Sequence, residues 1–170
     1  ERKGIDVRIA EVERIDPATR RVTLAGGEAL DADYLVISLG AELDPAPIPG
    51  LANAGHNFYT LPGAEALRDA LRTLRAGRIV VLTAAPAYKC PAAPYEAAML
   101  IEAFCRKRGV RDAVQIDVYA AEPAPMGVAG PEVSSAVKQL LAAKGIPYHP
   151  EHQVTAVDGS NRRLTFANGA

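Results

Sequence analysis

The sequence predicts an α/β fold in which a parallel sheet is flanked by antiparallel strands. Three observations lead to this prediction. Between residues 64 and 144, helical and strand-like segments alternate, as they do where crossover helices connect parallel strands. Residues 78–83 of that region include a continuous apolar run over 79–82, which indicates a buried strand. The two ends of the chain instead carry short strands joined by turns, which is typical of antiparallel hairpins.

The N-terminal part of the chain contains strand signals followed by a long loop. Apolar and polar side chains alternate over residues 5–15, which predicts a half-buried strand, and a second strand follows at 21–24. The run 34–39 is continuously apolar and ends at Gly40, which predicts a strand buried on both faces. Residues 44–62 are rich in Pro and Gly and predict a linker or wrapping loop.

The rest of the chain supplies the alternating helices and strands. Apolar residues recur at helical spacing, and a glycine follows each predicted helix, where glycine is typical of helix ends. The predicted elements are a helix over 64–75, a strand over 78–83, a helix over 94–108, a strand over 114–120, a helix over 131–144, and strands over 152–157 and 163–166. We therefore expect residues 1–62 to belong to one domain and residues 63–170 to form a second domain with a Rossmann-like parallel sheet.

The composition excludes several classes of function. The chain has 170 residues with nineteen basic and twenty acidic side chains, whereas nucleic-acid binding needs a basic surplus. No apolar run approaches the ~18 residues of a membrane-spanning helix. Two cysteines are too few for a disulfide scaffold. The Cys and His residues show no metal-ligand spacing, so we expect no metal site.

The loop after the strand 78–83 is the first candidate site, because ligands of α/β folds bind where a strand ends and the next helix begins. A dinucleotide-binding loop at this place carries closely spaced glycines, and the helix N-terminus holds the pyrophosphate. Residues 84–94 contain no glycine and three prolines, and Tyr88 adds bulk where a phosphate would need space. We therefore do not expect NAD(P) to bind at this loop.

The same loop brings a cysteine to the start of a helix. Cys90 precedes Pro94, which suits the first helical position. The helix dipole and the adjacent Lys89 both favour a thiolate at Cys90. Glu96, in the first turn, either exchanges protons near the sulfur or only complements the dipole. Cys105 falls mid-helix among apolar residues and is expected to be a buried thiol, and its pairing with Cys90 is left open.

Other polar residues and one glycine each have two interpretations. Glu122 follows a predicted strand, where an acid either holds ribose hydroxyls, as in dinucleotide folds, or has no role in binding. His149 and His152 precede a strand and are expected to lie at the surface or at a cap, as is His56 in the long loop. Gly40 either makes a turn or permits the close approach of a cofactor.

Two segments resemble a known superfamily of flavoproteins. Residues 33–40 resemble the strand-plus-glycine motif that passes close to FAD in enzymes with two dinucleotide-binding domains, although Leu39 replaces the usual threonine. Residues 88–96 resemble the redox cysteine segment of sulfide:quinone oxidoreductases and of the flavoprotein subunit of flavocytochrome c sulfide dehydrogenase. Residues 148–150 also resemble the latter group. The resemblance is thus to the FAD-dependent pyridine nucleotide-disulfide oxidoreductase superfamily.

This resemblance implies a set of functional residues. Ser38, Leu39 and Gly40 would bind FAD. Cys90 would capture sulfide sulfur together with a second cysteine further along the parent chain, and Glu96 would be the acid beside it. Electrons would then pass through FAD to a quinone or a cytochrome. The chain would be an internal fragment whose first domain is part of the FAD domain, and we expect it to be inactive alone and not to hold FAD tightly.

Two alternatives stay open. The parent is either the sulfide-oxidising enzyme or an NAD(P)H-dependent flavoprotein reductase of the same superfamily. In the third interpretation, the nucleotide-binding fold is retained as a non-catalytic scaffold or binding module. Residues 122–127 lack the histidine that some quinone-linked members carry after this strand, so both quinone and cytochrome remain as acceptors. The compartment of the parent also stays open among cytoplasm, membrane periphery and periplasm.

Overall fold

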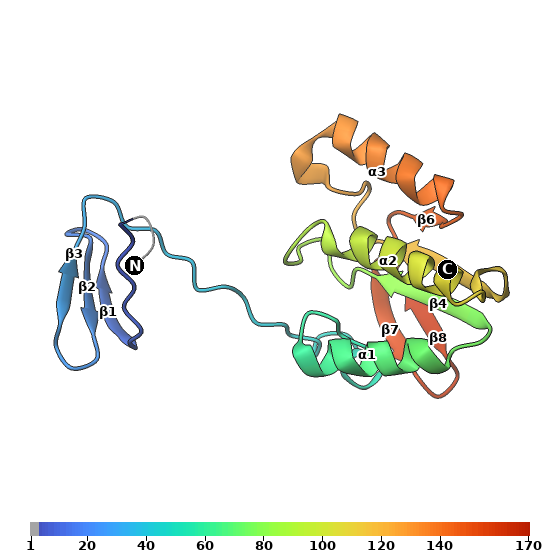
Figure 1. Ribbon diagram of the computed structural model, residues 1–170, viewed down its shortest axis with the longest axis horizontal. Helices are drawn as coiled ribbons and strands as arrows, with labels where there is room; N and C mark the ends of the chain where they lie inside the picture. The colour runs from blue at the N-terminus through green and yellow to red at the C-terminus, as the bar shows by residue number, and fades with distance from the viewer. Residues whose placement is uncertain (1–3) are drawn as a thin grey trace. The chain divides into compact units, whose positions relative to one another are not determined.

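The computed structural model describes residues 4–170 (Figure 1). The chain divides into two compact units, Glu1–Glu42 and Leu43–Ala170. Each unit has its own sheet and is described by itself. The sequence-based boundary between residues 62 and 63 concerns the domains of the whole protein and stays a prediction.

The first unit is a three-stranded antiparallel sheet in the order β1-β2-β3. Its strands are β1 (Val12–Asp16), β2 (Arg21–Leu24) and β3 (Ala29–Asp31). The Asp16 carboxylate accepts hydrogen bonds from the backbone N–H groups of Ala18 and Thr19 and so closes the turn between β1 and β2. The short strand β3 was not among the predicted elements.

One strand predicted for this unit is too long, and another is wrong. The strand expected over 5–15 begins only at Val12, and Ile9 is 99% exposed. Residues 34–39 form no strand, and Val36 is 86% exposed. A strand needs a neighbouring strand that satisfies its backbone hydrogen bonds. In the described part of this unit, neither segment has such a neighbour.

The second unit is built on a parallel three-stranded sheet in the order β4-β5-β6, which confirms the predicted Rossmann-like α/β fold. The strands are β4 (Gly77–Leu82), β5 (Val114–Tyr119) and β6 (Tyr148–His149), and the antiparallel hairpin is β7 (Val154–Asp158) with β8 (Arg163–Phe166). The α-helices are α1 (Leu61–Thr73), α2 (Ala93–Lys107) and α3 (Pro131–Ala143), and the short 3-10 helices are η1 (Leu51–Asn53), η2 (Arg111–Ala113) and η3 (Gly127–Ala129). Apart from β6, which was not predicted, each α-helix and strand of this unit begins and ends within three residues of its predicted bounds.

One face of the parallel sheet packs against the helices and forms the core. Ile116 and Val118 of β5 are fully buried, and Val81 of β4 is 4% exposed. These side chains pack against Ala98 and Ile101 of α2. Burying one such aliphatic side chain stabilises a fold by about 1.5–3 kcal/mol, so this cluster is the main source of stability in the unit.

The opposite face of the sheet carries charged and aromatic side chains. Asp117 of β5 is 1% exposed and accepts a hydrogen bond from Arg78 of β4 at 2.9 Å. Its other carboxylate oxygen lies 3.1 Å from Nε2 of His149 on β6. Tyr119 stacks on Phe166 of β8 with ring centroids 5.1 Å apart. The β7–β8 hairpin therefore covers this face through aromatic contact.

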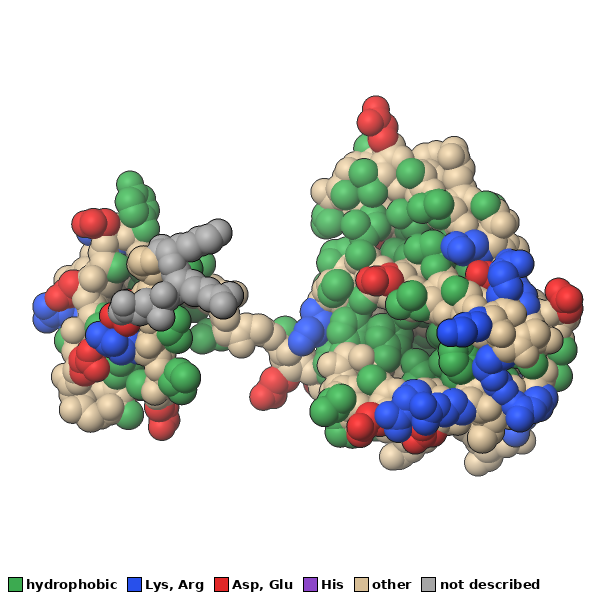
Figure 2. Space-filling view, in the orientation of Figure 1, with side chains coloured by type: hydrophobic (Ala, Val, Ile, Leu, Met, Phe, Trp, Pro, Cys, Tyr) green, Lys and Arg blue, Asp and Glu red, His purple; other side chains and the backbone are tan. Residues whose placement is uncertain are grey.

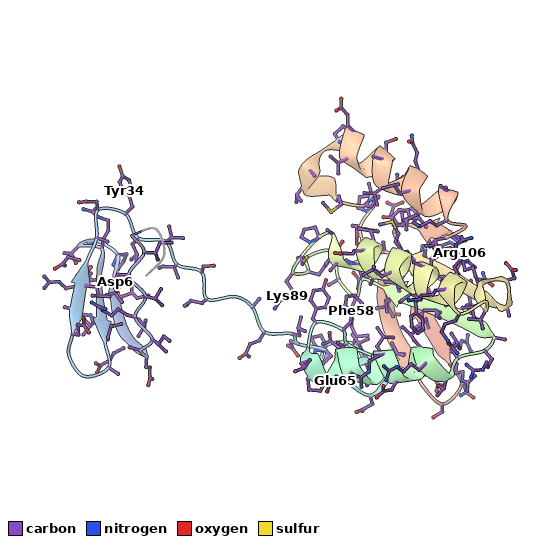
Figure 3. The ribbon with its side chains drawn as sticks, viewed as in Figure 1. Asp6, Tyr34, Phe58, Glu65, Lys89 and Arg106 are labelled. Carbon is purple, nitrogen blue, oxygen red and sulfur yellow. The ribbon has the colours of Figure 1, made fainter. Side chains whose placement is uncertain are left out.

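A second buried carboxylate ties the helical layer together. Glu102 of α2 is 1% exposed and forms ion pairs with Arg106, with Arg111 at 3.7 Å and with Lys144 at 3.6 Å. Arg111 also donates to the carbonyl of Gly145 at 2.9 Å. These contacts join α2 to η2 and to the residues that follow α3. Arg106 marks this end of α2 in Figure 3.

The outer surface of the helices differs from one part of the unit to another. Figure 2 shows hydrophobic side chains gathered between α3 and α2, whereas Lys and Arg side chains lie along α1 and the C-terminal end of α2. Leu100, Val128 and Leu140 are among the exposed apolar residues. Within residues 4–170, no helix combines the length and the apolar character that spanning a membrane requires.

Candidate functional site

The cysteine loop, defined as residues 83–92, joins the end of β4 to the start of α2. Cys90 is exposed and has φ 56°, in the left-handed region that residues other than glycine rarely adopt. Its carbonyl accepts a hydrogen bond from the N–H of Ala93, the first residue of α2, at 3.0 Å. The loop therefore turns sharply at the cysteine and presents it to solvent beside the helix N-terminus.

A tyrosine from the long N-terminal loop of this unit lies against the cysteine. The Tyr59 hydroxyl donates a hydrogen bond to the carbonyl oxygen of Lys89 at 2.8 Å. Burial raises the pKa of Tyr59, and a negative charge on the nearby Cys90 raises it further. Phe58 stacks on Tyr59 with ring centroids 5.1 Å apart, and Phe58 and Lys89 mark this contact in Figure 3. This side of the loop is thus held by a neutral hydroxyl donor.

On its other side, the loop is bound to Glu122, just beyond the end of β5. One carboxylate oxygen accepts hydrogen bonds from the hydroxyl of Tyr88, at 2.6 Å, and from that of Tyr95. The other oxygen accepts from the Thr83 hydroxyl at 2.7 Å. Burial and the bond to Glu122 raise the pKa of both tyrosines, so both hydroxyls keep their protons and act as donors. We call Thr83, Tyr88, Tyr95 and Glu122 the hydroxyl cluster.

The predicted catalytic residues are placed as follows. Cys90 lies three residues before the first residue of α2, and Glu96 is exposed in the first turn of that helix. In the described structure, the Glu96 side chain forms no hydrogen bond or ion pair, so its role as an acid stays a prediction. Cys105 is 1% exposed, which confirms the buried thiol, and burial raises its pKa. Both cysteines are free thiols.

The predicted cofactor-binding residues lie in the first unit. Ser38, Leu39 and Gly40 are all exposed. Gly40 has φ 77°, and a Cβ built there would meet no atom within 4 Å. This backbone is open to a large group lying along it, which fits the predicted approach of FAD. The contact itself stays a prediction.

The expectation that His149 and His152 are surface or capping residues is wrong. His149 is half-buried and stacks on Tyr119 with ring centroids 4.1 Å apart. His152 meets the Tyr119 and Phe166 rings edge-on, with both centroid distances 5.2 Å or less. The two histidines thus belong to the aromatic contact between the sheet and the hairpin. Among residues 4–170, no group of three or more His, Cys, Asp and Glu side chains is placed to hold a metal ion.

Sequence reasoning missed most of the partners of the cysteine loop. Tyr59, Thr83 and Tyr95 were not singled out, and Tyr88 was considered only for its bulk. The available signal was weak, because the hydroxyl donors stand 27 to 39 positions away from Glu122 along the chain. The prediction that a strand end gathers polar residues could have linked Thr83, at the end of β4, with Glu122.

An exposed cysteine at a strand-to-helix junction of a parallel α/β sheet is typical of thiol-dependent oxidoreductases. The chain belongs to the pyridine nucleotide-disulphide oxidoreductase family, which it matches over residues 1–170. The membership agrees with the resemblance drawn from residues 33–40 and 88–96.

Several individual proteins of known name are similar to this chain. The chain is 26% identical to a mitochondrial sulfide:quinone oxidoreductase of Dictyostelium discoideum over 88% of its own length and 34% of the relative. It is 30% identical to a demethylphylloquinone reductase of Synechocystis sp. over 96% of its own length and 40% of that protein. The crystal structure of the sulfide:quinone oxidoreductase of Aquifex aeolicus matches with a TM-score of 0.65 and 26% identity, covering 95% of this chain and 38% of that one. The chain therefore spans between a third and two-fifths of the length of these relatives.

Proposed function

We propose that the whole protein is an FAD-dependent enzyme that oxidises sulfide and passes the electrons to a quinone, and that Cys90 is the residue that takes up the sulfur. The observation that carries the proposal is the exposed cysteine fixed between β4 and α2 in a chain similar to sulfide:quinone oxidoreductases. A quinone is favoured over a cytochrome as acceptor, because the relatives include enzymes named for quinone reduction.

The sulfur chemistry needs Cys90 in a disulfide with a second cysteine. Hydrosulfide attacks one sulfur of this disulfide, the bond between the cysteines breaks, and one cysteine becomes a persulfide while the other leaves as a thiolate. FAD, when bound, supplies the two-electron acceptor for that thiolate and the route to the quinone. Glu96 would exchange protons with the sulfur. Cys105 does not fit the second role, because it is 1% exposed within α2, so another part of the whole protein supplies that cysteine.

The proposal is tested by sulfide-dependent quinone reduction in the whole protein. A Cys90→Ser variant is expected to lose activity by about three orders of magnitude, as enzymes do when a covalent nucleophile is removed. Cys105→Ala is the matched control, since it removes the other thiol of this chain from a position that sulfide does not reach. Substantial sulfide oxidation by Cys90→Ser, with Cys105→Ala also active, would overturn the proposal.

A further inference from the structure

We infer that Glu122 is a positioning residue for Cys90, which it holds in place through the hydroxyls of Tyr88, Tyr95 and Thr83. The inference rests on the proposed role of Cys90 and adds to it the group that sets the geometry of the thiol. Glu122 lies just beyond the end of β5, the neighbour of β4 in the sheet, and so approaches the cysteine loop from the adjacent strand end.

The cysteine loop needs anchoring by side chains. It contains Pro86 and Pro91, which have no backbone N–H to donate. It also holds Cys90 at φ 56°, a conformation that persists only where the surroundings fix it. An exposed loop that lacks two backbone donors and holds one strained residue gains its single conformation from side-chain contacts.

The hydroxyl cluster provides this anchoring at two places in the loop and one in the helix that follows it. Thr83 is at the start of the loop, Tyr88 is two residues before the cysteine, and Tyr95 is in the first turn of α2 beyond it. All three donate to the same carboxylate. The Thr83 hydroxyl also accepts from the N–H of Ala121 at 2.9 Å, which joins the start of the loop to the end of β5. Hydrogen bonds to a charged acceptor are roughly twice as strong as those between neutral groups.

The same contacts argue against a nucleotide at Glu122. An acid at this strand end holds ribose hydroxyls in dinucleotide-binding folds. Here both carboxylate oxygens already accept hydroxyl protons from the chain itself. A ribose held by both carboxylate oxygens would have to displace Tyr88 or Tyr95 from one of them, and Tyr95 is 2% exposed. Glu122 lies where dinucleotide-binding folds carry a ribose-binding acid, but here it anchors the cysteine loop.

The inference is tested with Tyr88→Phe and Glu122→Gln in the whole protein, with Tyr119→Phe as control. Tyr119→Phe removes a tyrosine hydroxyl from β5 that accepts a hydrogen bond from Arg78 and has no bond to Glu122. The first readout uses whole protein that has been reduced beforehand, so that Cys90 is a free thiol. It is the rate at which iodoacetamide alkylates the Cys90 peptide across pH, measured by mass spectrometry. The second is kcat and KM for sulfide. We expect Tyr88→Phe and Glu122→Gln to change the alkylation profile and to lower kcat about tenfold to a hundredfold with little change in KM, because a misplacement of about 1 Å costs up to a hundredfold.

The outcomes separate this inference from the proposed function. A changed alkylation profile in Tyr88→Phe, with Tyr119→Phe unchanged, supports the positioning role even if the protein does not oxidise sulfide. An alkylation profile and a kcat in Tyr88→Phe that equal those of the unmodified protein would overturn it, whatever the substrate. If Glu122→Gln does not fold, Tyr88→Phe, which keeps the aromatic ring, tests the positioning role by itself.

Discussion

Residues 34–39 and strand β4 both contain a continuous apolar run, yet they adopt opposite structures. In β4, Val81 pairs with Val118 of β5 and is 4% exposed. In the first unit, residues 34–39 form no strand, and Val36 is 86% exposed. An apolar run indicates only that its side chains favour burial. Whether it joins a sheet depends on the neighbouring elements. The candidate site follows the same rule, since the cysteine loop is anchored by a residue just beyond the neighbouring strand.

The largest expected effect comes from placing a charge in each of the two runs. Val81→Asp is expected to lower the free energy of unfolding of the 170-residue chain by about 4 kcal/mol or more, because an unpaired carboxylate would lie in the core. Val36→Asp, at an exposed position, is expected to change it by no more than about 0.5 kcal/mol. Urea unfolding followed by circular dichroism measures both. Equal losses in the two variants would show that the runs do not differ as described.

A smaller effect is expected from removing the charge of Asp117, which pairs with Arg78 and His149 on the second face of the sheet. Burial raises the pKa of Asp117, but the hydrogen bonds and charges of Arg78 and His149 outweigh it, so the pKa lies below the ordinary value of 3.8. A carboxyl whose pKa is lowered by folding stabilises the fold above its unfolded-state pKa, and this contribution is lost as the pH falls through the folded-state pKa. Asp117→Asn is therefore expected to lower the free energy of unfolding by about 1–3 kcal/mol at pH 7.

The control for this variant is in the other unit. Asp31 pairs with Arg21 at 2.7 Å, but its side chain is 61% exposed, so Asp31→Asn is expected to have no measurable effect on unfolding. The difference between the unmodified chain and Asp117→Asn should shrink as the pH falls below about 4. If Asp117→Asn lowers the free energy of unfolding as much at pH 2 as at pH 7, the charge of Asp117 is not what stabilises the fold.

The helices and most strands of the second unit were predictable because their signals are local. The helical spacing of apolar residues and the glycines after each helix predict α1, α2 and α3 to within three residues. Strand β6 was missed because it has only two residues, and its pairing with β5 depends on residues far away in the chain. The first part of the strand over 5–15 and the whole strand over 34–39 were predicted in excess, because a sequence pattern does not reveal whether a pairing partner is present.

The candidate site was predictable only where its chemistry is contiguous in sequence. Cys90, Glu96 and the following helix lie within one short segment, so their proximity could be read from the sequence. The hydroxyl cluster brings together residues from the ends of β4 and β5, the loop and α2. Its function as an anchor depends on which hydroxyl meets which carboxylate oxygen, and this follows only from the folded arrangement.

The measurement that tests a sulfur-handling Cys90 most directly is the flavin absorbance of the whole protein during anaerobic titration. We expect sulfide to bleach the flavin band, NADH to leave it unchanged, and the Cys90→Ser variant to keep its band when sulfide is added. Bleaching by NADH without bleaching by sulfide would identify a nicotinamide-dependent reductase instead. Bleaching by sulfide that is equally fast in Cys90→Ser would contradict the role of Cys90.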